Sequence, residues 1–77
     1  MKIRVKLFAS LRERFGFADK ELDLEEGQTV ADVWSAVAQD RTIPDNVLMA
    51  LNMDYVKPDT PLADGDEVAF FPPVTGG

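Results

Sequence analysis

The feature that most constrains the fold is one amphipathic helix pattern set among segments with the period of a β-strand. Apolar residues recur at i, i+3, i+4 and i+7 within residues 29–40, as Val30, Val33, Trp34 and Val37, which places them on one helical stripe. Thr29, with Asp32 three positions on, is typical of a capping box. We predict a helix here, with Trp34 at the centre of the core.

Short strand-like segments flank this helix on both sides. Residues 2–8 alternate between polar and apolar side chains, so Ile3, Val5 and Leu7 should face the core and Phe8 should fall on the opposite face. Further strands are predicted at residues 21–24, 47–51, 55–57 and 67–71, with a short helical turn at 9–15 that ends at Gly16. This order predicts an α+β domain in which a sheet of about five strands packs on one main helix, the layout of the ubiquitin-like β-grasp fold.

The residues that the chain lacks exclude several kinds of site. With 77 residues it has room for one core. It contains no cysteine and no histidine, so it lacks thiolate ligands, a cysteine nucleophile and the commonest general base. Asp64 and Asp66 flank a turn glycine and form too small a set for a cation site. We therefore expect no bound metal or cofactor and no self-sufficient enzyme.

Charge is unevenly distributed along the chain. Residues 1–20 hold six Lys or Arg against two acids, whereas residues 21–77 hold two against twelve. The acidic bulk disfavours nucleic acid, which needs a basic footprint, and favours partners with basic surfaces. No apolar run has the length of a membrane span and no N-terminal segment resembles a signal peptide. We expect a cytoplasmic protein without membrane contact.

Strand parity predicts an apolar patch on the outer face of the sheet. If Val68 and Phe70 join the core, then Phe71 must face outward. Phe8 would lie nearby on a neighbouring strand, and Tyr55 would face the same way. Exposed aromatic clusters of this kind usually mark an interface, so we predict that Phe8, Tyr55 and Phe71 form a partner-binding patch.

The last strand leads into a narrow arm that ends in two glycines. The predicted folded domain covers residues 1–71, and a flexible arm covers residues 72–77, namely Pro72, Pro73, Val74, Thr75, Gly76 and Gly77. The prolines stiffen the base of the arm, and the glycines lack the Cβ that would block a narrow channel. We predict that the terminal carboxylate of Gly77 is the reactive group and that the residues before it give it access.

Two segments resemble a known family. Residues 64–77 resemble the C-terminus of the molybdopterin synthase small subunit, the sulfur-carrier family called MoaD, and residues 6–13 resemble its opening strand and turn. The resemblance implies a mixed β-grasp sheet in which the first and last strands are parallel central neighbours. It also implies that an E1-like enzyme uses ATP to adenylate the Gly77 carboxylate, which then becomes a thiocarboxylate.

The resemblance further implies a role in molybdenum cofactor biosynthesis. The thiocarboxylate would donate sulfur to cyclic pyranopterin monophosphate inside the synthase, a heterotetramer whose large subunit supplies the catalytic residues. Two alternatives remain open at this point: a sulfur carrier for thiamine-thiazole or cysteine synthesis, and a ubiquitin-like protein modifier.

Overall fold

The computed structural model describes residues 1–40 and 42–72. Five strands and two helices follow one another as β1 Lys2–Leu7, α1 Ser10–Phe15, β2 Asp19–Asp23, α2 Val30–Ala38, β3 Leu48–Leu51, β4 Asp54–Tyr55 and β5 Glu67–Phe71. Each predicted strand and helix is present, although the boundaries of several differ by one or two residues. Of the predicted arm, only Pro72 lies within the described residues.

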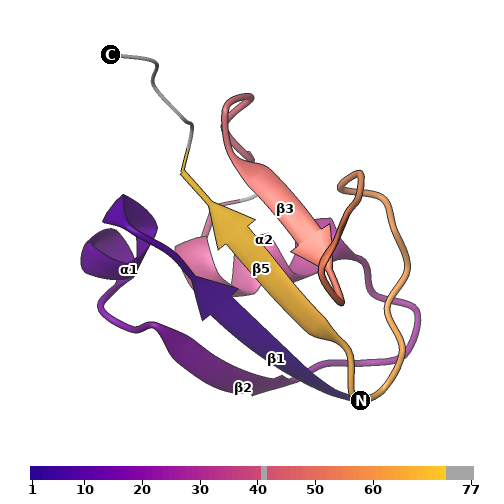
Figure 1. Ribbon diagram of the computed structural model, residues 1–77. Coiled ribbons are helices and arrows are strands. Elements are labelled where there is room, and N and C mark those ends of the chain that lie inside the picture. The colour runs from indigo at the N-terminus through magenta and orange to yellow at the C-terminus, as the bar shows by residue number, and fades with distance from the viewer. Residues whose placement is uncertain (41, 73–77) are drawn as a thin grey trace.

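The strands form one mixed sheet in the order β2-β1-β5-β3-β4 (Figure 1). β1 pairs with β2 in antiparallel fashion and with β5 in parallel fashion, which places the first and last strands side by side near the middle. β3 pairs with β5 and β4 in antiparallel fashion. The predicted β-grasp fold, including the parallel pairing of the first and last strands, is therefore confirmed.

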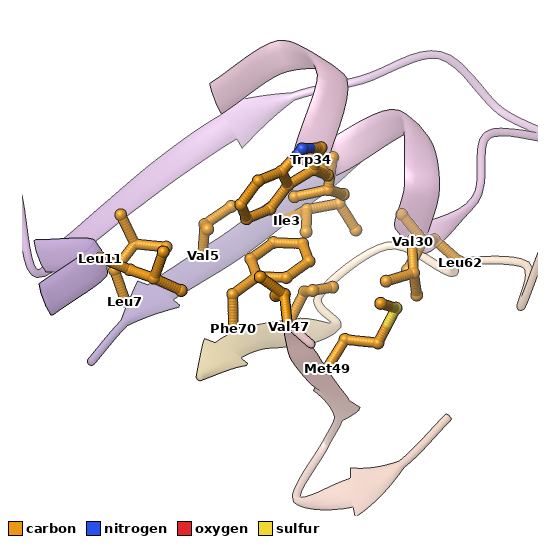
Figure 2. Close-up of a cluster of buried hydrophobic side chains, with 12 residues drawn as sticks. Ile3, Val5, Leu7, Leu11, Val30, Trp34, Val47, Met49, Leu62 and Phe70 are labelled. Carbon is orange, nitrogen blue, oxygen red and sulfur yellow. The ribbon is translucent and has the colours of Figure 1, made fainter. Parts of the chain in front are cut away.

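Helix α2 covers one face of the sheet and closes the core (Figure 1). Its capping box is present, because the Asp32 carboxylate accepts hydrogen bonds from the backbone N–H of Thr29 at 2.7 Å and from its hydroxyl at 3.2 Å. Trp34 is 1% exposed, and its ring meets that of Phe70 edge to face at 5.1 Å between centroids (Figure 2). The predicted position of Trp34 at the centre of the core is confirmed.

The residues that strand alternation predicts to point inward all lie on the face of the sheet that α2 covers. Ile3, Val5, Val68 and Phe70 are fully buried and Leu7 is nearly so (Figure 2). The indole N–H of Trp34 donates to the carbonyl of Thr42 at 3.2 Å, so the one polar atom of the ring is satisfied inside an apolar cluster. Alternate residues of β1 and β5 must then point to the opposite, outer face.

The hairpin between β3 and β4 is tighter than predicted. The predicted strands at 47–51 and 55–57 leave residues 52–54 between them for the turn, but Asp54 pairs with Leu51 and the strand is Asp54–Tyr55. Asn52 and Met53 alone form the loop, with φ of 50° and 75°. Two central residues with positive φ match the twist of a two-residue hairpin, and the sequence lacks the Asn-Gly pair that signals such a turn.

Within residues 1–40 and 42–72, no helix combines the length and the apolar character that crossing a bilayer requires.

Candidate functional site: the outer face of the sheet

The outer face brings together the three aromatic residues that parity placed there. The rings of Phe8 and Phe71 stack with centroids 4.7 Å apart and planes 10° from parallel. Tyr55 meets Phe71 edge to face at 6.3 Å. Phe8 directly follows β1, Phe71 ends β5 and Tyr55 ends β4, so three strands that are distant in sequence contribute to one aromatic cluster, which we call the outer patch.

The outer patch is open to solvent. Phe8 is 41% exposed and Tyr55 is 73% exposed, while Phe71 is half-buried between them. By contrast, Phe70 is fully buried although it is the immediate neighbour of Phe71. Exposed aromatic rings that contact one another are the usual anchors of protein–protein interfaces, so the geometry is suited to docking.

Beside the aromatic rings the sheet is hollowed into a groove of about 350 Å³, which we call the outer groove. Its floor consists of two small residues that pair across β3 and β5, Ala50 and Ala69. Both are buried even though they lie on the outer face, because the larger side chains that line the groove surround them. The apolar walls are Phe8, Met53, Tyr55 and Phe71.

One ion pair lies along the same groove. Lys6 Nζ is 3.7 Å from a carboxylate oxygen of Glu67, and each side chain is a little more than one-third exposed. Lys6 pairs with Ala69 across β1 and β5, and Glu67 lies two residues before Ala69 on β5, so both charges lie on the outer face beside the alanine floor. A partly exposed pair of this kind adds little stability, but it gives this side of the groove polar groups that a partner must match.

The arm begins where the outer patch ends. Phe71 is the last residue of β5, and Pro72 follows it at half-buried exposure. Residues 73–77, which include the predicted access residues Pro73, Val74, Thr75 and Gly76 and the predicted reactive Gly77, lie outside the described residues.

Sequence reasoning missed two apolar residues of this face. Leu48 is 42% exposed and pairs with Phe71 across β3 and β5. Residues 47–51 are all apolar, so this predicted strand shows no alternation that would mark Leu48 as facing outward. Met53 is 91% exposed at the tip of the hairpin. No periodicity marks a turn residue, so only the tertiary structure places Met53 on the groove.

The acidic turn at residues 64–66 has a structural use. The Asp64 carboxylate accepts a hydrogen bond from the backbone N–H of Lys2 at 2.6 Å. Asp66 accepts from the side-chain amide of Asn52 at 3.0 Å and from the backbone N–H of Ala63 at 2.8 Å. These bonds tie the turn to the start of β1 and to the β3–β4 hairpin, and no cluster of three or more acidic side chains suited to a metal occurs among the described residues.

A sequence model of the ThiS family matches residues 5–77. The chain belongs to the ThiS family. It is 39% identical to the molybdopterin synthase sulfur carrier subunit of Escherichia coli strain K12, over 97% of this chain and 99% of the relative. It is 36% identical to the subunit of that name from Chlamydomonas reinhardtii, with both chains fully covered.

Among solved structures, the fold is similar to that of SAMP1 from Haloferax volcanii. The TM-score is 0.89 at 29% identity, with 100% of both chains covered. Within the ThiS family this chain therefore groups with the molybdopterin synthase sulfur carrier subunits of molybdenum cofactor biosynthesis. The resemblance read from residues 6–13 and 64–77 is confirmed, and so is the predicted carrier role.

Proposed function

We propose that this chain carries sulfur as a thiocarboxylate on Gly77 and delivers it inside molybdopterin synthase. The observation that supports this most directly is the position of the outer patch, which is exposed, aromatic and continuous with the base of the arm at Phe71 and Pro72. A partner that holds this patch receives the terminus next to it. The five residues after Pro72 can span at most ~16 Å at about 3.3 Å each.

The proposed chemistry begins at the Gly77 carboxylate. An E1-like enzyme lets this carboxylate attack the α-phosphate of ATP, which releases pyrophosphate and forms an acyl-adenylate. A sulfur nucleophile then displaces AMP and leaves the thiocarboxylate. Because the chain has no cysteine and no histidine, we assign acid–base catalysis in both steps to its partners.

Sulfur transfer completes the cycle. The thiocarboxylate sulfur bonds to a carbon of cyclic pyranopterin monophosphate while that carbon loses its bond to oxygen, and the oxygen leaves with a proton supplied by the large subunit. Water then attacks the Gly77 carbonyl carbon and breaks its bond to sulfur, which stays on the pterin. The carboxylate is restored and can be activated again. Two such transfers build the dithiolene of molybdopterin, with the catalytic residues on the large subunit of a heterotetramer.

The test measures the mass change at the C-terminal residue Gly77. The chain is incubated with ATP, its activating enzyme and a sulfur donor, and the expected product has one oxygen replaced by sulfur at Gly77. Deleting Gly77, or adding a residue after it, should abolish both this product and molybdopterin formation with an unchanged thermal melt. Protease removal of the added residue should restore activity, and full activity of the uncleaved extended chain would contradict the proposal.

A protein-modifier role is the second candidate, because the SAMP1 neighbour is named a small archaeal modifier protein in a related solved structure. A modifier would use the same activated terminus but would form an isopeptide bond to a lysine. In the incubation above, a lysine conjugate without the sulfur-for-oxygen product would favour it. A carrier for thiazole or cysteine synthesis would instead form the thiocarboxylate but fail to support molybdopterin formation.

The expected cytoplasmic location stays a prediction.

A further inference from the structure

A second groove runs along the β4 edge of the sheet. β4 is only two residues long and pairs with Ala50 and Leu51, so the first half of β3 has no strand beside it on that side. The hollow there, which we call the edge groove, has a volume of about 370 Å³. Among the described residues it shares only Tyr55 with the outer groove, so the two grooves are separate sites.

The lining of the edge groove is mostly apolar. Its walls come from the loop before β3, from β3 itself and from the loop after β4, and they include Ile43, Leu48 and Val56. Its charged residues, Asp45 and Lys57, are both exposed. The ion pairs formed within residues 1–40 and 42–72 do not include Lys57. The groove therefore suits a protein that offers apolar surface together with an anionic group for Lys57.

The edge groove adjoins the base of the arm. Leu48 is both a wall of this groove and the residue that pairs with Phe71 at the end of β5. Neighbouring strands lie about 4.8 Å apart, so the groove begins about one strand spacing from the end of β5. The five residues after Pro72 can span up to ~16 Å, which is enough for Gly77 to reach a protein seated in the groove.

The proposed reaction needs a second docking surface at one step. The acyl-adenylate of Gly77 is a mixed anhydride that water hydrolyses, so sulfur must arrive while the activating enzyme still holds the carrier. We expect that enzyme to cover the outer patch. A protein that delivers sulfur at this step must then contact the carrier elsewhere, and the edge groove lies next to the arm.

We propose that the edge groove docks a sulfur-donor protein, which carries its sulfur as a cysteine persulfide. The inference rests on the function proposed above. The ionised form of a thiol is its nucleophilic form, and an ionised persulfide is likewise an anion that the Lys57 ammonium attracts. The apolar walls hold the protein around the persulfide, while Lys57 draws the sulfur towards the terminus.

The transfer involves two bond exchanges. The outer persulfide sulfur attacks the Gly77 carbonyl carbon and bonds to it, while the bond to AMP breaks and AMP leaves with the electron pair. The donor and the carrier are then joined by an acyl disulfide. A thiolate next attacks the donor's cysteine sulfur, is oxidised to a disulfide with it, and leaves the other sulfur on Gly77 as the thiocarboxylate. This chain has no cysteine, so the thiolate comes from another molecule.

The test compares protein donors with free sulfide, which needs no docking surface. The full chain, the activating enzyme and ATP are mixed with sodium sulfide, with a cysteine desulfurase loaded by cysteine, or with a sulfurtransferase loaded by thiosulfate. Each protein donor is freed of small molecules by gel filtration, because added thiol would release sulfide. The rate of sulfur attachment at Gly77, as acyl disulfide plus thiocarboxylate, is followed by mass spectrometry.

Two variants change the edge groove. Lys57→Glu reverses its cationic charge and Ile43→Ala trims an apolar wall, and each should slow attachment from a protein donor by at least ~5-fold without changing the rate with sulfide. Lys20→Glu is the control for the first variant, because exposed Lys20 lies on β2 at the opposite edge of the sheet. Leu22→Ala is the control for the second, because Leu22 and Ile43 are both half-buried against the core. Both controls should match the parent with every sulfur source.

Several outcomes would overturn the inference. A parent-like rate of either groove variant with both protein donors is the first. Slower attachment from sulfide as well, or weaker binding to the activating enzyme, would assign the edge groove to that enzyme. Weaker binding to the large subunit would assign it to the synthase, and a parent dimer that Lys57→Glu dissociates would assign it to a second copy. If the parent itself gains no sulfur from sulfide, the proposed function fails, and the inference fails with it.

Discussion

The two faces of the sheet use the same kinds of residue for opposite purposes. On the inner face, Trp34 and Phe70 meet edge to face and are buried under α2. On the outer face, Phe8 and Phe71 stack in the open, with Tyr55 beside them. Phe70 and Phe71 are adjacent in sequence, so an aromatic residue contributes to folding or to docking according to its face. Residue type alone therefore does not identify the site.

The largest expected effect is on the inner face. Trp34→Ala should lower the free energy of unfolding by ~3–5 kcal/mol, the usual cost of emptying a large buried site, which is a large share of the stability of a small domain. Denaturant unfolding measures it, with Tyr55→Ala as the control because Tyr55 is 73% exposed. If Trp34→Ala and Tyr55→Ala lost equal free energy of unfolding, the inner face would contribute no more to stability than the outer face, and the contrast would be wrong.

Phe71→Ala should weaken binding to the large subunit and to the activating enzyme by ~2 kcal/mol or more if it anchors the outer patch. Its melting temperature should fall less than that of Phe70→Ala, the neighbouring inner-face variant. Because both partners must receive the same terminus, we also expect the two complexes to exclude each other. Calorimetry on each variant and a competition experiment test this, and simultaneous binding of both partners would count against a single docking surface.

A smaller effect is expected where α2 begins. Asp32→Ala removes the acceptor of the two Thr29 hydrogen bonds and should cost ~1 kcal/mol of stability, as the loss of a helix cap usually does. Binding should stay unchanged, because the capping box lies on the helix side of the sheet. Denaturant unfolding gives the change in stability and a titration with the large subunit gives the change in affinity. If Asp32→Ala binds poorly but keeps full stability, the separation of folding and docking between the two faces is wrong.

The smallest effect concerns the ion pair on the outer face. Glu67→Gln should change stability by less than ~1 kcal/mol, because the pair with Lys6 is partly exposed and screened by salt. Its effect on the rate of association with the large subunit should be larger than its effect on melting, and should shrink as salt is raised. Stopped-flow measurement of the association rate constant at two ionic strengths tests this prediction. If neither the substitution nor the salt changes the rate constant, Lys6 and Glu67 are not part of the docking surface.

Strand parity and helix periodicity are local, and they predicted most of the architecture. The alternation of residues 2–8 correctly separated the buried Ile3 and Val5 from the exposed Phe8. The spacing of Val30, Val33 and Trp34 correctly oriented α2. The β3–β4 hairpin was misplaced by one residue because Asn52-Met53 lacks the glycine that marks its turn.

The sequence by itself determined which face each strand residue occupies and where α2 is capped, because both depend on neighbours a few positions away. It also determined the family, through the segment around Phe71 and the final glycines. Strand parity also placed Phe8, Tyr55 and Phe71 on one face, but only the tertiary structure decided how these rings touch and that Met53 joins them. Phe8 stacks on Phe71 because β1 and β5 pair in parallel, and Met53 reaches the groove because a two-residue loop turns β4 back along β3. Pairing and register join segments that are distant in the chain, so no local pattern encodes the site that they build.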